Sequence, residues 1–252
     1  MTDRIPCCEL SDQSTVNLWV VDLDDRSVPD ATLDAILSPD EKKRAARFLF
    51  EPDAWHFKLC RVMLRIGLAL HLGKTAKGIQ ITTTEKGKPY LDEGDLHFNV
   101  SHCGGTGLLA FTLAGEIGVD VEAVRTDVEG LEIAAQNFHA REIEFIASAD
   151  DSRDQACRFT RIWTRKEAVL KATGDGVTDG LSSFDVSQKS KSTIPYTNPQ
   201  RDTSELILNV EDIAISGTTF GAVAGPNREW TICQASVNPG ILLGMIPPAV
   251  LS

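Results

Sequence analysis

The stretch TGLLAFTLAGEIGVDVEAV, residues 106–124, contains two apolar runs separated by a glycine and a charged residue. The first run, residues 106–114, has the length and the apolar content of a buried strand. Gly115 and Glu116 then predict a tight hairpin into a second strand, residues 117–124.

Amino-terminal to this hairpin, the sequence predicts a strand followed by helices. Residues 15–23 alternate as a strand does, and residues 38–50 predict a helix that begins at a capping serine. Residues 53–72 repeat apolar side chains at helical spacing and end at Gly73, which predicts a long core helix. Short extended pieces separated by turns follow between residues 78 and 100.

Carboxy-terminal to the hairpin, the same kinds of element recur. Helices are predicted around residues 129–149 and from residue 154 to 173, where Gly174 ends the second one. Strands are predicted near residues 182–187, 205–215, 218–224 and 229–236.

The two sets of elements predict an α+β fold built from two similar halves. The first half would be residues 1–115, and the second would be residues 116–252. Residues 188–204 are polar and carry two prolines, so they predict an exposed loop. The apolar tail after Pro239, which Pro247 and Pro248 interrupt, predicts an extended strap at the end of the second half.

The composition is that of a folded protein and excludes several functional classes. Of the 252 residues, 42% are apolar and 24% are charged, which excludes disorder of the whole chain. The net charge of −11 argues against a nucleic-acid binder, because such proteins neutralise phosphates with Lys and Arg. No segment has the ~20 apolar residues needed to span a membrane, and the first ten residues do not resemble a secretory signal.

The cysteine pattern indicates a reducing compartment. The six cysteines stand at positions 7, 8, 60, 103, 157 and 233, without a CxxC pair. A zinc site or a disulfide framework is therefore poorly supported, and we expect reduced thiols in the cytoplasm. The neighbouring Cys7 and Cys8 could form a redox pair, although a silent terminus explains them as well.

Asp120 and Glu122 are the first candidates for a functional site. On a strand they share one face, while Val119 and Val121 share the other, apolar face. Two neighbouring carboxylates repel each other unless a cation lies between them, and Mg²⁺ binds one or two protein carboxylates together with water and phosphate. An ordinary solvated strand face would show the same pattern.

The second candidate is WTRKEAVLK, residues 163–171. On a helix Glu167 and Lys171 lie one turn apart, and Trp163 lies one turn before them. The plain interpretation is a surface ion pair. If the tryptophan shelters the pair, however, the carboxylate could bind metal or accept a proton, and the ammonium could hold phosphate.

The third candidate combines GKP, residues 87–89, with HFNVSH, residues 97–102. Lys88 stands between Gly and Pro, whose backbone constraints can direct its ammonium group. Ser101 and His102 offer hydrogen-bond donors to a phosphate near the end of a strand. A turn lysine and a loop histidine are the alternatives.

A basic cluster occurs on the helix predicted at residues 38–50. It comprises Lys42, Lys43, Arg44 and Arg47. Most such clusters are solvated helix faces, so this one is functional only if an anionic ligand lies nearby.

Taken in order, these motifs resemble the 4'-phosphopantetheinyl transferase superfamily, of the surfactin-synthetase-activating type. The resemblance spans residues 37–184 and includes LSPDEKKRAARF, EKGKPYL, LHFNVSH, IGVDVE and WTRKEAVLKATGDGV. It implies two α+β halves related by a pseudo-twofold axis, with the active site in the cleft between them. It also implies Mg²⁺-dependent transfer of phosphopantetheine from coenzyme A to a serine of an apo acyl or peptidyl carrier protein, with release of 3',5'-ADP.

The resemblance also assigns roles to residues. It implies that Asp120, Glu122 and Glu167 bind Mg²⁺, and that Glu167, Lys171 and Asp120 are catalytic. It implies that coenzyme A is contacted by Arg44, Lys88, Ser101, His102 and Lys171. The base could be Glu167 or a metal-bound water that Glu167 orients.

Two positions depart from the family pattern and leave the adenine contacts open. His56 stands where relatives often have arginine, and Glu41 stands where some have lysine. A Mg²⁺-dependent hydrolase acting on coenzyme A and a catalytically silent binder of coenzyme A or a carrier remain as alternatives. We expect a monomer with a carrier-docking surface that is mostly apolar with a few basic groups, whereas the pathway that the carrier serves is not defined by these motifs.

Overall fold

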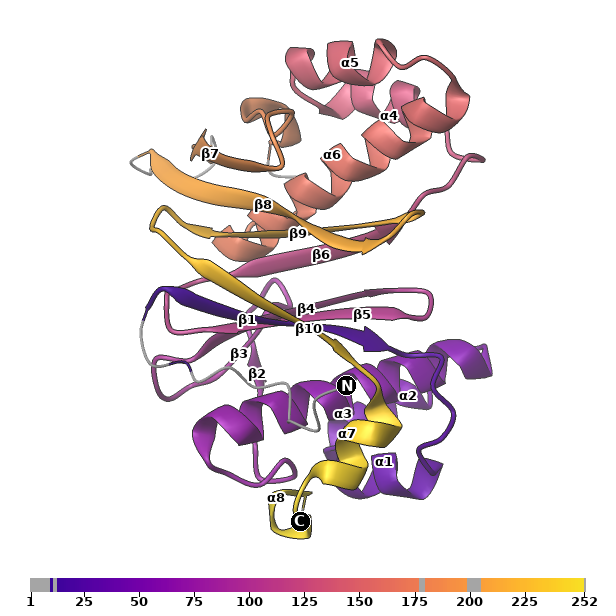
Figure 1. Cartoon of the computed structure of the whole chain (residues 1–252), viewed down its shortest axis with the longest axis vertical. Coiled ribbons are helices and arrows are strands. Elements are labelled where there is room, and N and C mark those ends of the chain that lie inside the picture. The colour runs from indigo at the N-terminus through magenta and orange to yellow at the C-terminus, as the bar shows by residue number, and fades with distance from the viewer. Residues whose placement is uncertain (1–9, 11–12, 177–179, 199–204, 252) are drawn as a thin grey trace.

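The computed structural model describes residues 10, 13–176, 180–198 and 205–251, and it contains two four-stranded sheets that face each other (Figure 1). The first sheet contains, in spatial order, β10 (Thr231–Val237), β1 (Thr15–Asp22), β5 (Thr106–Thr112) and β4 (His97–Cys103). The second contains β6 (Gly118–Ala123), β9 (Thr219–Pro226), β8 (Leu206–Ser216) and β7 (Lys191–Tyr196). A separate small sheet pairs β2 (Thr82–Thr83) with β3 (Pro89–Tyr90). This mixed architecture confirms the predicted α+β class, while the pseudo-twofold relation stays a prediction.

Helices cover the outer faces of both sheets (Figure 1). On the side of the first sheet lie α1 (Asp30–Ile36), α2 (Pro39–Ala45), α3 (Glu51–Leu72), α7 (Pro239–Met245) and α8 (Pro248–Leu251). On the side of the second lie α4 (Gly130–Asn137), α5 (Ala140–Ala147) and α6 (Ser152–Thr173), and a 3₁₀ turn, η1, spans Leu181–Ser183. No helix in the described part of the chain is long and apolar enough to cross a membrane.

The helix ends follow the sequence signals. Ser38 caps α2 in a capping box, in which its side chain accepts from the backbone N–H of Glu41 and the Glu41 side chain accepts from that of Ser38. The long helices α3 and α6 end at Gly73 and Gly174, which have φ values of 62° and 71°. This left-handed conformation favours glycine, and so both predicted endpoints are confirmed.

Alternation along the strands divides the apolar side chains among three cores. In β1, Val16 and Leu18 face the core between the two sheets, whereas Trp19 and Val21 face the core beneath α3. A third core lies between the second sheet and α6. The protein is therefore layered as helix, sheet, sheet, helix, and the two halves share the middle core.

The hairpin predicted at Gly115 and Glu116 is wrong. β5 pairs with β1 and β4, whereas β6 pairs with β9 in the other sheet. Gly115, at φ 118°, takes the chain from one sheet to the next. A glycine beside a charged residue is compatible with either connection, because only the pairing partners distinguish a hairpin from a crossover.

The carboxy-terminal region departs from the prediction in other places. The strand expected at residues 182–187 is replaced by the 3₁₀ turn, and the expected loop at 188–204 contains β7 in its described part. The tail packs as two short helices rather than as an extended strap, and Leu242 and Ile246 enter the core beneath α3.

The last strand, β10, returns to the first sheet. It lies parallel to β1, with Val16 opposite Ile232 and Val20 opposite Ser236. The division at residues 115 and 116 stays a prediction about domains, and residues 231–251 pack with the first sheet although they follow that boundary.

Candidate active site

Gly118 brings the first acidic residue of the site against α6. A Cβ atom at Gly118 would lie 2.1 Å from the Ala168 carbonyl oxygen and 2.3 Å from the Ala172 backbone nitrogen. Only glycine allows this approach of β6 to the helix. Because Asp120 is on the same face of β6 as Gly118, its side chain also lies toward α6.

Asp120 has a cationic partner on one oxygen and none on the other. Its Oδ1 accepts from Lys171 Nζ at 2.6 Å and from Ser101 Oγ at 2.8 Å. Its Oδ2 is buried and lacks a hydrogen-bond partner within the described structure. A buried carboxylate oxygen without a partner is costly, which is expected where a further cation or donor binds.

The first sheet contributes to the same site across the junction of the two sheets. Asn99 Oδ1, on β4, accepts from the Val119 N–H of β6 at 2.9 Å. Two residues further along β4, Ser101 donates to Asp120 and accepts from Lys171 Nζ at 3.0 Å. The predicted residues Ser101, Asp120 and Lys171 therefore meet in one hydrogen-bonded cluster.

Glu122 and Glu167 add two negative charges beside Asp120. Burial raises the pKa of Glu167, and the charges of Asp120 and Glu122 raise it further against the opposing effect of Lys171. Burial and the charge of Asp120 likewise raise the pKa of Glu122. The positive charge near these three carboxylates is therefore too small to balance their negative charges.

The oxygen donors of Asp120, Glu122 and Glu167 are chemically suited to bind a magnesium ion. Oxygen donors, one of them buried and without a partner, are what a hard cation requires. Among the described residues, no group of three His, Cys, Asp or Glu side chains is already arranged to hold a metal. Because Mg²⁺ retains several water and phosphate ligands, a complete protein cage is not needed.

Trp163 belongs to an aromatic cluster on the outer side of the second sheet. Its ring packs at 6.2 Å from Phe138 and 6.0 Å from Phe159 in the core of the second half. It holds α6 against α4, one turn before Glu167.

A cavity of about 560 Å³ lies on the side of the first half and is lined by two predicted ligand-binding residues, Arg44 and His102. Burial lowers the pKa of His102, and the nearby charges of His56, Lys171 and Arg44 lower it further. His102 is therefore a neutral ring in positively charged surroundings, which suits an anionic ligand.

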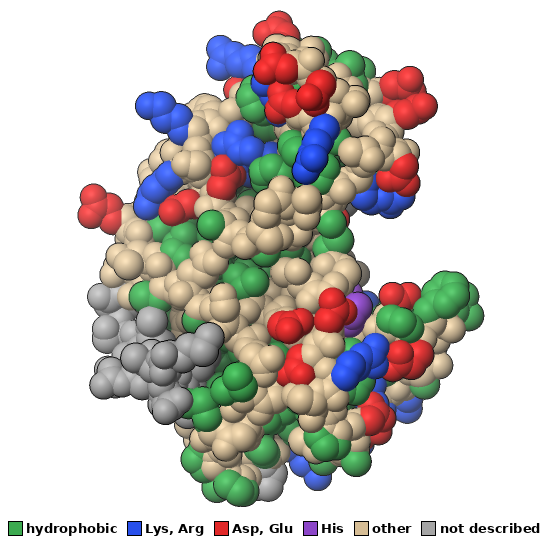
Figure 2. Space-filling view, turned by 45° about the vertical axis from the view of Figure 1, so that its right-hand side comes forward, with side chains coloured by type: hydrophobic (Ala, Val, Ile, Leu, Met, Phe, Trp, Pro, Cys, Tyr) green, Lys and Arg blue, Asp and Glu red, His purple; other side chains and the backbone are tan. Residues whose placement is uncertain are grey.

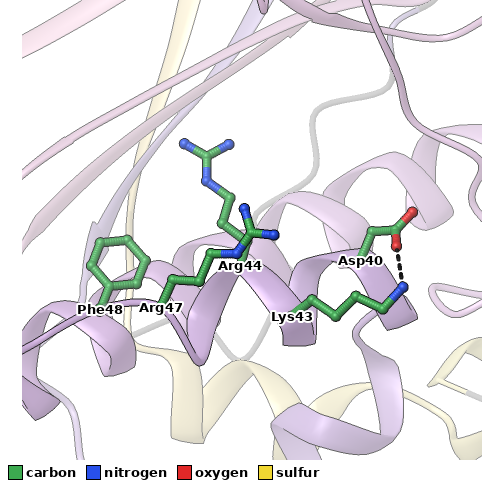
Figure 3. Close-up of a pocket in the computed structure, with 5 residues that line it drawn as sticks. All are labelled: Asp40, Lys43, Arg44, Arg47 and Phe48. Carbon is green, nitrogen blue, oxygen red and sulfur yellow. Dashed lines mark hydrogen bonds and ion pairs between the residues drawn. The ribbon is translucent and has the colours of Figure 1, made fainter.

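Arg44 also borders a second, more open cavity of about 650 Å³ on the outer side of α2 (Figure 3). Figure 3 shows Arg44, Arg47 and Phe48 together, while Lys43 is paired with Asp40 at 3.2 Å. Arg44 also lies 5.2 Å from the centre of the Phe57 ring. Within the described residues, no acidic side chain forms an ion pair with Arg44 or Arg47, and Lys42 does not line this cavity.

The Lys88 ammonium, predicted to contact phosphate, is held by other groups of the protein in this structure. Its Nζ forms an ion pair with Glu116 and donates to the Ala172 carbonyl at 3.1 Å. Its neighbours Gly87 and Pro89 line the same cavity as His102, but the Lys88 side chain lines another cavity.

An ion-pair network that no motif indicated lines the same cavity as His102. Glu41 accepts from Arg61 Nε at 2.7 Å and from Arg65 Nε at 2.6 Å. Burial raises the pKa of Glu41, but both arginines outweigh that effect and lower it. The available signal was the pair Arg61 and Arg65, which stand one turn apart among apolar residues in the middle of α3.

The departure at position 56 also has a structural setting. His56 Nε2 lies 2.9 Å from Asp24 Oδ1, and the charge of His56 acts on His102. The charge of His56 therefore influences His102, which lines the cavity.

The molecular surface is hollowed on one side between the upper and lower lobes (Figure 2). Histidine, acidic and basic side chains gather at the lower margin of this hollow. Cys7 and Cys8 lie outside the described residues, and the described cysteines at 60, 103, 157 and 233 are free thiols.

Two family models match the chain, one on each side of the crossover. The model described as the 4'-phosphopantetheinyl transferase superfamily matches residues 116–217, and the one described as 4'-phosphopantetheinyl transferase, N-terminal, matches residues 30–113. The chain is 38% identical to the 4'-phosphopantetheinyl transferase HetI of Nostoc over 172 residues, which are 67% of this chain and 71% of HetI.

More distant relatives carry similar names. The chain is 33% identical to the 4'-phosphopantetheinyl transferase Sfp of Bacillus subtilis, over 60% of this chain and 66% of Sfp. It is 32% identical to the mouse L-aminoadipate-semialdehyde dehydrogenase-phosphopantetheinyl transferase, over 60% of this chain and 53% of that protein.

Proposed function

The chain belongs to the 4'-phosphopantetheinyl transferase superfamily, and on this premise we propose that it transfers phosphopantetheine from coenzyme A to a serine of an apo carrier protein. The observation that carries the proposal is the cluster of Asp120, Lys171 and Ser101 at the junction of the two sheets. A cavity lined by Arg44 and His102 is electrostatically connected to this cluster, because the charge of Lys171 lowers the pKa of His102.

In the proposed reaction, the carrier serine oxygen bonds to the phosphorus next to pantetheine. The bond from that phosphorus to the bridging pyrophosphate oxygen breaks, and 3',5'-ADP leaves. Lys171 places an ammonium group at the site, where it can stabilise the negative charge that develops on the phosphates. Ser101 orients both Lys171 and Asp120.

Asp120, Glu122 and Glu167 are the residues that would hold Mg²⁺. Bound there, the ion would neutralise phosphate charge as a Lewis acid. Glu167 is also suited to accept the proton of the serine hydroxyl, directly or through a water, because its raised pKa makes it a stronger base than an ordinary carboxylate.

The remaining contacts to coenzyme A are assigned to the first half. Arg44 and His102 line the cavity from opposite elements, α2 and β4, and would contact the nucleotide phosphates. Lys88 would contact phosphate once its ammonium group separates from Glu116. Glu41 is fully engaged with Arg61 and Arg65, so it supports the cavity wall rather than contacting adenine.

The outer side of α2 provides a surface for the carrier. Lys43 and Arg47 line the open cavity there together with Phe48, and the next two residues of the chain, Leu49 and Phe50, are 92% and 69% exposed. This combination of apolar and basic side chains is what we expect of a docking surface for an acidic carrier. Arg44 borders both this surface and the cavity.

We further assign the protein to the cytoplasm and expect it to be a monomer. The free described thiols suit a reducing compartment. A single chain already supplies both faces of the site, so a second copy is not required.

The test is intact-mass spectrometry of an apo carrier incubated with the protein, coenzyme A and Mg²⁺. We expect a mass gain equal to phosphopantetheine that disappears with EDTA and with Glu167→Ala. Glu229→Ala, which removes an exposed carboxylate from the loop before β10, serves as the matched control and should retain the gain. Splitting of coenzyme A without a carrier would indicate the hydrolase, and binding without any reaction on peptide, polyketide and fatty-acid carriers would indicate the silent binder.

A further inference from the structure

Glu116 lies at the crossover between the two sheets and binds two residues of the first half. Its carboxylate pairs with Lys88 Nζ through one oxygen and lies 3.2 Å from His97 Nδ1 through the other. The same Lys88 ammonium donates to Ala172, in the last turn of α6. One lysine therefore joins the loop before β3, the crossover and the helix that carries Lys171.

The negative charge of Glu116 is fixed over the whole physiological range. The hydrogen bond with His97 lowers its pKa most, burial opposes it, and the hydrogen bond and charge of Lys88 add to the lowering, so that the pKa is about 2. The end of α6 adds a partial negative charge on the other side of the ammonium. The charge of Lys88 is therefore largely neutralised where it lies.

The backbone on either side of Lys88 lines the cavity, but its side chain is paired with Glu116 outside that cavity. Gly87 and Pro89 line the cavity that contains Arg44 and His102, whereas the Lys88 side chain is held toward Glu116 and His97. Only 12% of the Lys88 side chain is exposed. A phosphate group in the cavity and the Glu116 carboxylate would therefore compete for the same ammonium.

We propose that Glu116 is a positioning residue that restrains Lys88 and thereby weakens the binding of coenzyme A phosphates. This inference rests on the proposed function, in which the cavity holds coenzyme A. Removing the carboxylate charge while keeping a hydrogen-bond acceptor releases the ammonium for the ligand. Glu116 thus sets the affinity for the nucleotide without touching it.

The test is calorimetric titration of 3',5'-ADP and of coenzyme A into the whole protein, without carrier and with EDTA present. We expect Glu116→Gln to lower both Kd values about 3- to 10-fold, as for the loss of one nearby like charge. Glu85→Gln is the matched control, because Glu85 is exposed on the same loop and three residues before Lys88. It should leave Kd within about twofold.

A double-mutant cycle separates release of Lys88 from a general change of charge. In the Lys88→Met background, Glu116→Gln should no longer tighten binding. Tightening that persists without Lys88, or a Kd that is unchanged or raised in Glu116→Gln, would overturn the inference. A raised Kd would mean that Glu116 holds Lys88 in its productive position.

Folding and the proposed function are checked in the same series. His97→Gln weakens the hold on Glu116 and should shift Kd in the same direction by a smaller factor, which keeps the test decisive if Glu116→Gln unfolds. Failure of the wild-type protein to bind either ligand would contradict the proposed function. Binding by the wild type with no effect of Glu116→Gln contradicts this inference alone.

Discussion

Lys166 and Glu167 are consecutive residues of α6, yet their surroundings differ in almost every respect. The Lys166 side chain is fully buried, pairs with Glu142 at 2.8 Å and donates to the carbonyls of Leu181 and Phe184. Glu167 lies near two other carboxylates, and within the described residues it has no hydrogen-bond partner.

These two settings separate a charge that stabilises the fold from a charge that is available for chemistry. Burial alone would neutralise the Lys166–Glu142 pair, because it lowers the pKa of Lys166 and raises that of Glu142, and the two ions stabilise each other against it. For Glu167, burial and repulsion from Asp120 and Glu122 together exceed the attraction of Lys171, so its pKa stays raised. A carboxylate whose pKa is raised by burial and by neighbouring carboxylates is typical of a functional site.

Breaking the buried pair should have the largest effect. Lys166→Met leaves the Glu142 charge buried and should lower the free energy of unfolding by about 3–5 kcal/mol. Urea unfolding of the purified protein measures this. The double variant Lys166→Met with Glu142→Leu should recover most of the loss, and a single variant as stable as the wild type would contradict the comparison.

Changing Glu167 should reduce activity without reducing stability. Glu167→Gln should reduce transfer at least about 100-fold, the order of loss when a key group of a charged site is removed. It should leave the free energy of unfolding unchanged or higher, because it removes repulsion. Steady-state rates and urea unfolding on the same preparation test both statements, and a large loss of stability would place Glu167 with Lys166 as a structural residue.

The carboxylate cluster should also determine the response to pH. Because the folded-state pKa values of Glu122 and Glu167 are raised above 4.5, these groups favour folding below that pH, and this contribution is lost as pH rises through the raised values. Mg²⁺ requires the ionised forms, so activity should fall on acidification before ordinary carboxylates titrate. Rates between pH 5 and 8 at several Mg²⁺ concentrations measure this, and an acid limb that excess Mg²⁺ does not shift would argue against the metal assignment.

The smallest effect is expected at the proposed docking surface next to α2, which does not include Lys166 or Glu167. Lys43→Ala with Arg47→Ala should raise KM for the carrier about 3- to 10-fold and leave kcat unchanged, because such exposed charges act mainly on association. Lys42→Ala, on the same helix but outside the cavity, is the control. An unchanged KM would exclude this surface as the docking site.

The sequence predicted the elements of this fold better than their partners. Apolar spacing and a terminal glycine were sufficient for α3 and α6, because a helix is stabilised by contacts within a few residues. The hairpin at Gly115 was wrong because strand pairing depends on residues more than 90 positions away, as in the pairing of β6 with β9.

The candidate site shows the same limit. The motifs named Asp120, Ser101 and Lys171, and the structure brings them together. No motif could indicate that Lys88 is paired with Glu116, because this contact spans 28 positions and crosses from one predicted half to the other. Residue roles beyond these contacts stay predictions.

The parallel pairing of β10 with β1 also affects how the chain is made. During synthesis, residues 15–112 leave the ribosome long before residues 231–237, so the first sheet lacks one strand while everything between them is added. Until β10 is made, the open side of β1 would be available for strand pairing with another chain, so β10 also protects the sheet edge from aggregation.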